Sequence, residues 1–186
     1  MRRLSIIATI ALLLLSLTAF GQENLISLNG GYAFANLEEA DENTAGWRIG
    51  LSYEFNPSEG AWAHGGVVSY ISTESDATDH SDGLTKQYKI NTWPIYYAPK
   101  FLFGGDRFKG FLKGALGMQI SNFKRTGPIL IFEDNGFGFY GGLGAGTMVT
   151  FGTIFINAEY EWAYMSNSYY RDGVMNSAML GVGIYF

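Results

Sequence analysis

A strict alternation of large apolar residues with polar or small ones is the feature that most restricts how this chain can fold. Between residues 47 and 55, every second side chain is large and apolar, and the positions between them are polar or glycine. The same pattern recurs in residues 154–164 and 177–186. A helix would repeat its apolar positions every three or four residues, so no helical period explains the split. The sequence therefore predicts β-strands with one apolar face.

Five weaker segments with the same alternation raise the expected number of strands to eight. They are residues 25–37, 61–71, 87–103, 108–122 and 137–151. Short turn-forming connections alternate with long ones, the latter at residues 38–44, 72–86, 123–136 and 167–174. Such an order predicts an all-β fold, an eight-stranded antiparallel up-and-down transmembrane β-barrel with a short-turn end and a long-loop end. The composition agrees, because 25 glycines and 16% aromatic residues suit crowded β-structure.

Residues 1–21 have a different character from the rest of the chain. Arg2 and Arg3 precede an almost wholly apolar run over residues 4–17, and Ala19-Phe20-Gly21 supplies small residues at a cleavage site. The pattern predicts a cleaved signal peptide over residues 1–21 and a β-barrel domain over residues 22–186. An uncleaved anchor is the alternative, although the run is short for a membrane helix of about 20 residues.

Charge and cysteine content exclude several classes of function. Without Arg2 and Arg3, 10 basic residues face 17 acidic ones, a net charge of −7 that argues against a nucleic-acid partner. The chain has no cysteine, which rules out disulfides, thiolate metal sites, a cysteine nucleophile and a lipid-modified cysteine.

The interior of an eight-stranded barrel is narrow enough to be filled by side chains. The residues with charged side chains expected to face this lumen are Arg48, Glu54, Lys113, Glu159 and Glu161. A buried charge needs a partner, so we expect a salt-bridged polar network. A tight turn at residues 152–153 would set Glu159 opposite Gly146 and Glu161 opposite Gly144, where the glycines leave room. A polar path for ions or small solutes is the alternative interpretation.

Pro94 fits poorly within the fourth expected strand. A closed sheet has no free edge at which its missing N–H would be harmless. We therefore expect a β-bulge at Pro94.

Several motifs together resemble a known family. They are the segment 93–101 (Trp-Pro-Ile-Tyr-Tyr-Ala-Pro-Lys-Phe), the glycine-alternating segments 113–118 and 140–146, and the terminal Phe186 behind alternating apolar residues. The chain resembles the small bacterial outer-membrane β-barrels of OmpX-like and PorT-like type. The resemblance implies an outer-membrane location and Phe186 as a signal for the barrel-assembly machinery. The even number of expected strands places both termini at the short-turn, periplasmic end. Many such proteins have no established activity.

His64 is the one histidine within an expected strand. A five-residue turn at residues 56–60 would set it opposite Ser52 and near Glu54, as in a Ser–His–Glu constellation; a four-residue turn would turn it to the other face. The comparison that matters is the lipid A deacylase barrel, but Gly65 and Gly66 follow His64, so its His-x-Ser pair is missing. We expect no catalytic residue, cofactor or metal in the barrel.

The long loops carry two further candidate features. Two loops are acidic, with Glu38, Glu39, Asp41 and Glu42 in the first and Glu74, Asp76, Asp79 and Asp82 in the second. Oxygen ligands in clusters suggest calcium, but the spacing matches no calcium-loop motif, and solvated acidic loops are the commoner case. The third loop contains an apolar run that we interpret as a contact site, comprising Ile129, Leu130, Ile131 and Phe132.

Aromatic residues near the ends of the expected strands are typical of girdles at a lipid interface. They include Trp47, Trp62, Tyr70, Trp162 and Tyr164.

The leading hypothesis is a non-enzymatic outer-membrane barrel that displays four extracellular loops, in surface interaction, adhesion or envelope integrity. Its expected partners are outer-membrane lipid, the barrel-assembly machinery, and an extracellular protein or surface bound through the loops. Three alternatives stay open: a narrow channel for ions or small solutes, a lipid-modifying barrel enzyme, and a soluble periplasmic lipocalin-like barrel that binds a ligand.

Overall fold

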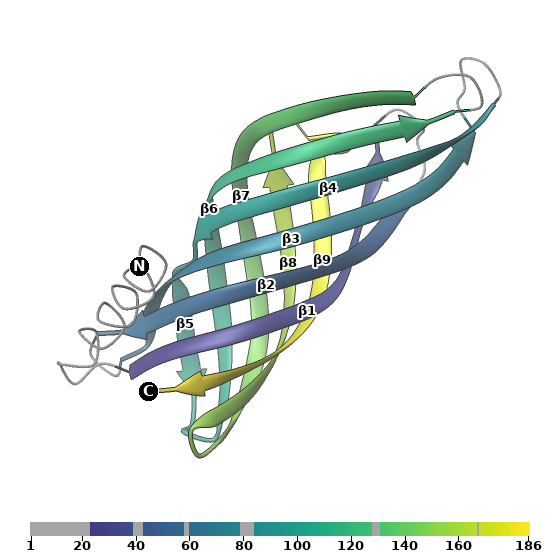
Figure 1. The fold of residues 1–186 in the computed structure, drawn as a ribbon. Coiled ribbons are helices and arrows are strands. Elements are labelled where there is room, and N and C mark those ends of the chain that lie inside the picture. The colour runs from purple at the N-terminus through teal and green to yellow at the C-terminus, as the bar shows by residue number, and fades with distance from the viewer. Residues whose placement is uncertain (1–22, 39–42, 58–59, 79–83, 128–130, 167) are drawn as a thin grey trace, which may run out of the picture.

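The computed structural model describes residues 23–38, 43–57, 60–78, 84–127, 131–166 and 168–186, which form one antiparallel β-sheet closed into a barrel (Figure 1). The strands are β1 (Glu23–Leu37), β2 (Asn43–Asn56), β3 (Trp62–Thr78), β4 (Thr85–Tyr97), β5 (Lys100–Gly104), β6 (Phe108–Thr126), β7 (Ile131–Phe151), β8 (Ile154–Met165) and β9 (Tyr170–Tyr185). Pairing of β1 with β9 closes the sheet. No helix within these ranges is both long enough and apolar enough to cross a membrane.

β4 and β5 are two segments of one strand. The register that pairs Tyr96 with Val67 of β3 continues unchanged when Lys100 pairs with Ala63. Across the break, the backbone N–H of Ala98 donates to Gly65 O at 2.8 Å. Pro99 has no N–H to offer β6, and this is where the regular strand is interrupted. The barrel therefore has eight strands, which confirms the prediction.

The expected bulge at Pro94 is wrong. Pro94 pairs with Gln119 of β6, and the residues on either side keep the same register. Towards β3 the ladder lacks rungs at Trp93 and Pro94 but resumes in register at Thr92 and Ile95. The proline thus removes a hydrogen bond without shifting the strand. The irregularity lies instead in β9, where the register with β1 shifts next to the left-handed Asp172 (φ 55°).

Four strands are longer than the sequence pattern predicts. β3 and β4 continue until Thr78 pairs with Thr85, and β6 and β7 continue until Thr126 pairs with Ile131. Much of the two expected loops at residues 72–86 and 123–136 is therefore strand. The pattern missed these residues because both faces of the sheet are largely polar there. We call this region of β3, β4, β6 and β7 the sheet extension (Figure 1).

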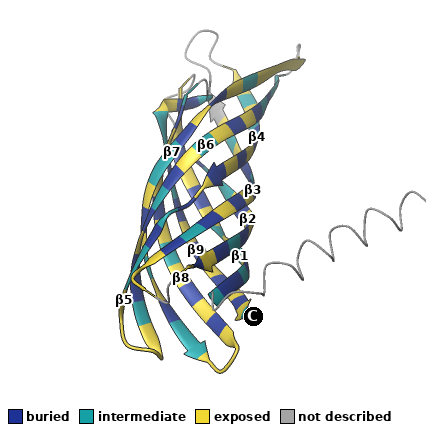
Figure 2. Cartoon of the chain, turned by 90° about the vertical axis from the view of Figure 1, so that its left-hand side faces the viewer, coloured by how far each residue is buried: buried dark blue, intermediate teal, exposed yellow. Residues whose placement is uncertain are grey.

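The outer wall of the barrel is apolar. Buried and exposed residues alternate along much of the barrel wall (Figure 2), and the outward positions include Leu143 and Leu180, which are 68% and 67% exposed. A soluble lipocalin-like barrel would turn its apolar residues inward. That alternative is therefore wrong. The expected girdle residues Trp47, Trp62, Trp162 and Tyr164 are all exposed, and Tyr70 packs half-buried between Trp47 and Trp93.

The outer face changes character in successive rows across β3, β4, β6 and β7. Following the strand registers towards the sheet extension, the rows are Val68–Ile95–Met118–Phe139, Tyr70–Trp93–Ile120–Phe137, Ser72–Asn91–Asn122–Asn135 and Glu74–Lys89–Lys124–Glu133. The rows pass from apolar through aromatic and amide to charged side chains. This order of side-chain types is typical of a lipid-facing wall that ends at the membrane–water interface. The sheet extension therefore stands beyond the apolar wall.

The interior is layered. The long-loop end is filled by an apolar cluster that includes Leu37, Ile71, Ile90, Phe123, Met165, Tyr170 and Met175. The short-turn end is filled by a smaller cluster of Leu25, Phe111, Met148 and Phe155. The buried charged residues lie between the two clusters.

Candidate functional site

The charged layer of the lumen is the candidate site. Its residues come from four strands whose alternation turns them inward: Arg48 and Glu54 from β2, Lys100 from β5, Lys113 from β6, and Glu159 and Glu161 from β8. The side chains of all six residues are at most 10% exposed.

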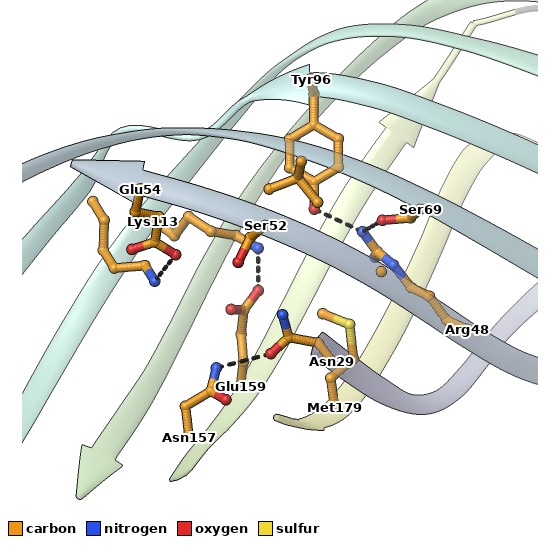
Figure 3. A pocket seen from close by; sticks show the side chains of 13 residues that line it. Asn29, Arg48, Ser52, Glu54, Ser69, Tyr96, Lys113, Asn157, Glu159 and Met179 are labelled. Atoms are coloured by element: carbon orange, nitrogen blue, oxygen red, sulfur yellow. Dashed lines mark hydrogen bonds and ion pairs between the residues drawn. The ribbon is translucent and has the colours of Figure 1, made fainter. Parts of the chain in front are cut away.

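Arg48 and Glu161 form the centre of this layer. Arg48 Nη1 donates to Glu161 Oε1 at 2.6 Å and to Ser177 Oγ at 3.2 Å. Its Nη2 donates to the Tyr96 hydroxyl at 2.9 Å (Figure 3). Both terminal nitrogens of the guanidinium thus have an acceptor, whereas the buried Nε of Arg48 has no hydrogen-bond partner among the described residues.

Glu161 is fully buried and is compensated from several sides. Besides Arg48, Lys113 Nζ lies 2.5 Å from Glu161 Oε2. The Tyr140 hydroxyl donates to Oε1, and the Tyr96 hydroxyl lies 3.3 Å from Oε2. Two cations and two phenols around one carboxylate offset the cost of removing it from water.

Glu159 completes the cluster from the same strand. Its Oε1 accepts a hydrogen bond from Lys113 Nζ (Figure 3). Glu159 pairs in the sheet with Gly146, and Glu161 pairs with Gly144, which is the expected register. A Cβ added to Gly144 would lie 3.3 Å from Lys113 Cε and 3.4 Å from Glu159 Oε1. The glycine is therefore needed to give these two side chains room.

A second ion pair lies nearer the short-turn end. Lys100 Nζ donates to Glu54 Oε1 at 2.6 Å and sits 4.5 Å from the centre of the Phe111 ring. Sequence reasoning missed Lys100 as a lumen residue, and likewise Tyr96 and Tyr140. Uninterrupted alternation along the fourth expected strand would have placed Lys100 on the inward face. The bulge expected at Pro94 would reverse the facing of every residue after it, so Lys100 was not assigned to the lumen.

The layer is balanced in charge and tightly filled. Three cations, Arg48, Lys100 and Lys113, face three carboxylates. The cavity left among them measures about 20 Å³, which is room for about one water molecule. Chemically, this arrangement crosslinks strands across the lumen.

The structure does not bring His64 together with Ser52 and Glu54. His64 pairs with Phe55, and Ser52 pairs with Val67. His64 therefore faces the outer wall, where its Nδ1 lies 2.5 Å from the Tyr97 hydroxyl, whereas Ser52 faces inward and hydrogen-bonds to Ser27. The register that would assemble a Ser–His–Glu constellation is therefore wrong. His64 does face the other side of the sheet, but not through a shorter turn, because β2 ends at Asn56 and β3 begins only at Trp62.

The remaining candidates lie at the ends of the barrel. In the part of the chain that the structure describes, no three His, Asp or Glu side chains are grouped as a metal site. Glu74 is paired with Lys89, and Ile131 is 62% exposed. Phe186 exchanges backbone hydrogen bonds with Asn24 where β1 meets β9. Outside the described residues lie the signal peptide 1–21, the acidic residues Glu39, Asp41, Glu42, Asp79 and Asp82, and the contact candidates Ile129 and Leu130.

Solved structures of similar fold are small outer-membrane barrels. Ail, the attachment invasion locus protein of Yersinia pestis, superposes with a TM-score of 0.58 at 19% identity, covering 88% of this chain and 98% of Ail. Neisserial surface protein A gives 0.63 at 14% identity, covering 88% and 97%. The N-terminal β-barrel domain of Pseudomonas aeruginosa OprF gives 0.50 at 15% identity, covering 90% and 98%. At these identities the likeness shows the fold alone.

Comparison at the level of sequence identifies the family. No curated protein matches the chain significantly. The outer membrane protein beta-barrel domain family, however, matches residues 7–186, nearly the whole sequence. The apolar outer wall and the closed eight-stranded barrel agree with that match. The chain therefore belongs to the outer membrane protein beta-barrel domain family and is a transmembrane barrel of the outer membrane.

Proposed function

We propose that this barrel is a non-enzymatic surface protein that presents its long-loop end outside the cell and binds a partner there. The sheet extension is the observation that carries the proposal. It stands beyond the apolar wall and carries the amide and charged rows on its outer face, a chemistry suited to water and not to lipid. Two of the similar structures, Ail and Neisserial surface protein A, are named for attachment or for the cell surface, which agrees with such a role.

The tip of the extension has the chemistry of a contact site. Ile131 and Phe132, at the start of β7, are 62% and 41% exposed although they lie past the charged row. Within the described residues, pairing of β7 with β8 begins only at Tyr140, so residues 131–136 of β7 have no strand on that side. An open edge beside exposed apolar side chains favours a protein partner that adds a strand or packs on the tip.

The layered interior weighs against a channel. A conducting pore needs a continuous wet path, but here an apolar cluster fills each end of the lumen and the ion pairs fill the middle. The separation of His64 from Ser52 and Glu54 weighs likewise against a lipid-modifying enzyme on the outer wall.

The orientation is tested with single cysteines, which is straightforward because the natural chain has none. Ile131→Cys at the tip should react with a membrane-impermeant maleimide on intact cells. Thr153→Cys in the turn at the opposite end should react only after the outer membrane is permeabilised. The reverse pattern would contradict the proposed orientation.

Partner binding is tested with cells that express the barrel on a monolayer of cultured epithelial cells. Ile131→Asp should lower adhesion towards the level of cells without the barrel, because it replaces an exposed apolar side chain with a charge. Thr85→Asp, on the neighbouring hairpin, is the matched control that adds the same charge without removing an apolar group. Equal adhesion of both variants and the wild type would refute a contact role for the tip.

A further inference from the structure

The outer wall carries a pocket of about 540 Å³ at the long-loop end, where β1 and β2 meet β9. Its floor is aromatic: the rings of Tyr32 and Phe34 lie 6.2 Å apart, tilted by 30°, and both are exposed. Its rim is polar, with Asn36 and Asn43 on one side and Asn176 on the other. The pocket belongs neither to the charged lumen nor to the tip of the sheet extension.

The irregularity in β9 builds one wall of this pocket. Met175 pairs with Ala35 and Tyr170 pairs with Leu37, so the four residues between them in β9 face Asn36 alone. Asp172 and Gly173 both take left-handed φ values, 55° and 68°, and aspartate is one of the few residue types other than glycine that adopt this conformation readily. The bulge places Arg171 and Asp172, both exposed, on the rim of the pocket.

The pocket straddles the boundary between the apolar wall and the wet rim. Following the registers, Tyr32 lies between Trp47 and Ala178, within the aromatic part of the wall. Phe34 lies between Ala45 and Asn176 one row higher, and Asn36 pairs with Asn43 above that. Ala45 beside Phe34 and Ala178 beside Tyr32 have small side chains, and the two aromatic residues are 36% and 55% exposed. A molecule bound here would be apolar at its lower end and polar at its upper end.

A shallow groove lies next to the pocket on the same wall, because Ala178 of the groove pairs with Tyr32 of the pocket. It measures about 570 Å³ and lies over β1, β7, β8 and β9, where Gly30, Ala158 and Ala178 face outward beside Leu180. The missing side chains create a trough in a wall that otherwise projects large apolar groups. A trough of this kind fits a hydrocarbon chain that runs parallel to the barrel wall.

The polar side chains of the rim limit which chemical groups of a ligand can bind at the upper end of the pocket. Asparagine amides donate and accept hydrogen bonds, a carboxylate accepts and a guanidinium donates, so the set matches neighbouring hydroxyl groups. Arg171 and Asp172 cancel in charge, which favours an uncharged polar group over a phosphate. An open aromatic face suits the C–H face of a sugar ring. The Tyr160 hydroxyl donates to Asn176 Oδ1 at 2.7 Å and holds that amide in place.

From these features we propose that the pocket binds the sugar headgroup of a membrane glycolipid, with an acyl chain in the groove below it. The inference is independent of the adhesive role proposed for the tip, because the two sites share no residue. Ile131→Asp should leave glycolipid binding unchanged, so failure of one proposal is distinguishable from failure of the other.

The test uses the full barrel in phosphatidylcholine nanodiscs with lipopolysaccharide as the probe. Gly30→Leu fills the groove, and it should be tolerated because the nearest atom to an added Cβ is Arg48 O at 3.9 Å. Tyr32→Ala removes the aromatic floor. Each should weaken lipopolysaccharide binding by about tenfold or more. The matched control is Gly66→Leu, an outward glycine of β3 with no atom within 4 Å of an added Cβ, which should bind like the wild type.

The shift in gel migration between unboiled and boiled samples verifies that each variant is folded. Wild-type affinity in both Gly30→Leu and Tyr32→Ala would overturn the proposal. Competition by phosphatidylglycerol as strong as that by lipopolysaccharide would also overturn it, because the pocket would then not select a sugar headgroup. A further outcome would also overturn the proposal. If the oligosaccharide without its acyl chains binds as tightly as intact lipopolysaccharide, and Gly30→Leu does not change its affinity, the acyl chain makes no contact with the groove.

Discussion

Arg48 and Glu161 are 113 residues apart in the chain, yet they form an ion pair of 2.6 Å at the fully buried centre of the barrel. The pair links β2 to β8 across the lumen. Around it, Tyr96, Tyr140 and Lys113 complete the contacts of the carboxylate. The pair therefore joins two strands that are not neighbours in the sheet, and its loss leaves a charge where water has little access.

Removal of Arg48 should strongly destabilise the barrel. Arg48→Ala leaves Glu161 with Lys113 as its remaining cation and leaves part of the centre unfilled. Breaking a buried pair in this way costs about 3–5 kcal/mol of unfolding free energy. Urea unfolding of the barrel refolded in lipid vesicles, followed by tryptophan fluorescence, measures the change.

The exposed pair Lys89–Glu74 on the sheet extension is the control for that experiment. Lys89→Ala should cost only about 0–1 kcal/mol, because water solvates the remaining carboxylate. A loss in Arg48→Ala no larger than in Lys89→Ala would mean that the central pair contributes little. Restoration of stability in Arg48→Met combined with Glu161→Gln would identify the unpaired charge as the cause.

The closed interior predicts that the wild-type barrel does not conduct. The largest side chains of the two apolar clusters, among them Phe123 at one end and Phe111 at the other, are almost fully buried. Planar bilayers that contain the purified barrel should show no reproducible conductance steps, while an open porin in the same bilayer does. Discrete steps that depend on Arg48 or Lys113 would revive the narrow-channel alternative.

The residues of the charged layer could be predicted from the sequence wherever the apolar–polar alternation of the strand is uninterrupted. The register around the turn at residues 152–153 could be predicted in full, since Gly152 with φ 64° makes the tight turn and Glu159 then faces Gly146. Lys100 was lost because proline was expected to shift the strand, whereas Pro94 and Pro99 remove hydrogen bonds and keep the register. The register across the β2–β3 connection is the other weak point: His64 pairs with Phe55 and not with Ser52, and this shift of three residues turns its side chain to the opposite face.

The sheet extension and the wall pocket could not be predicted, for different physical reasons. The last residues of β3 before Thr78 and of β6 before Thr126 are mostly polar in sequence, so they show no apolar period to detect. The pocket depends on a bulge at Asp172, which the alternation of β9 does not reveal, and on neighbours from β1 and β2 that only the closed register brings together.

Gly144 should not tolerate a residue as large as leucine. Its added Cβ already approaches Lys113 Cε and Glu159 Oε1, so the further atoms of Gly144→Leu would displace the Lys113 ion pairs. We expect the variant not to reach the folded form, visible as loss of the fast-migrating band of unboiled protein. Gly66→Leu, on the outer wall, should keep that band. A folded Gly144→Leu barrel would show that the cluster can rearrange.

Tyr169, in the connection between β8 and β9, provides a pH-dependent test of the loop end. Its ring stacks on Phe123 with centroids 4.6 Å apart, and burial together with hydrogen bonding to Asp134 raises the pKa of Tyr169 to about 12. An unfolded tyrosine has a pKa of about 10. Because the folded value is the higher one, the contribution of Tyr169 to stability is fully present below pH of about 10 and is lost as the pH rises towards 12. The ultraviolet absorbance of phenolate, compared between wild type and Tyr169→Phe, isolates this group. Asp134→Asn should lower the pKa of Tyr169, and an unchanged titration in that variant would show that burial alone sets it.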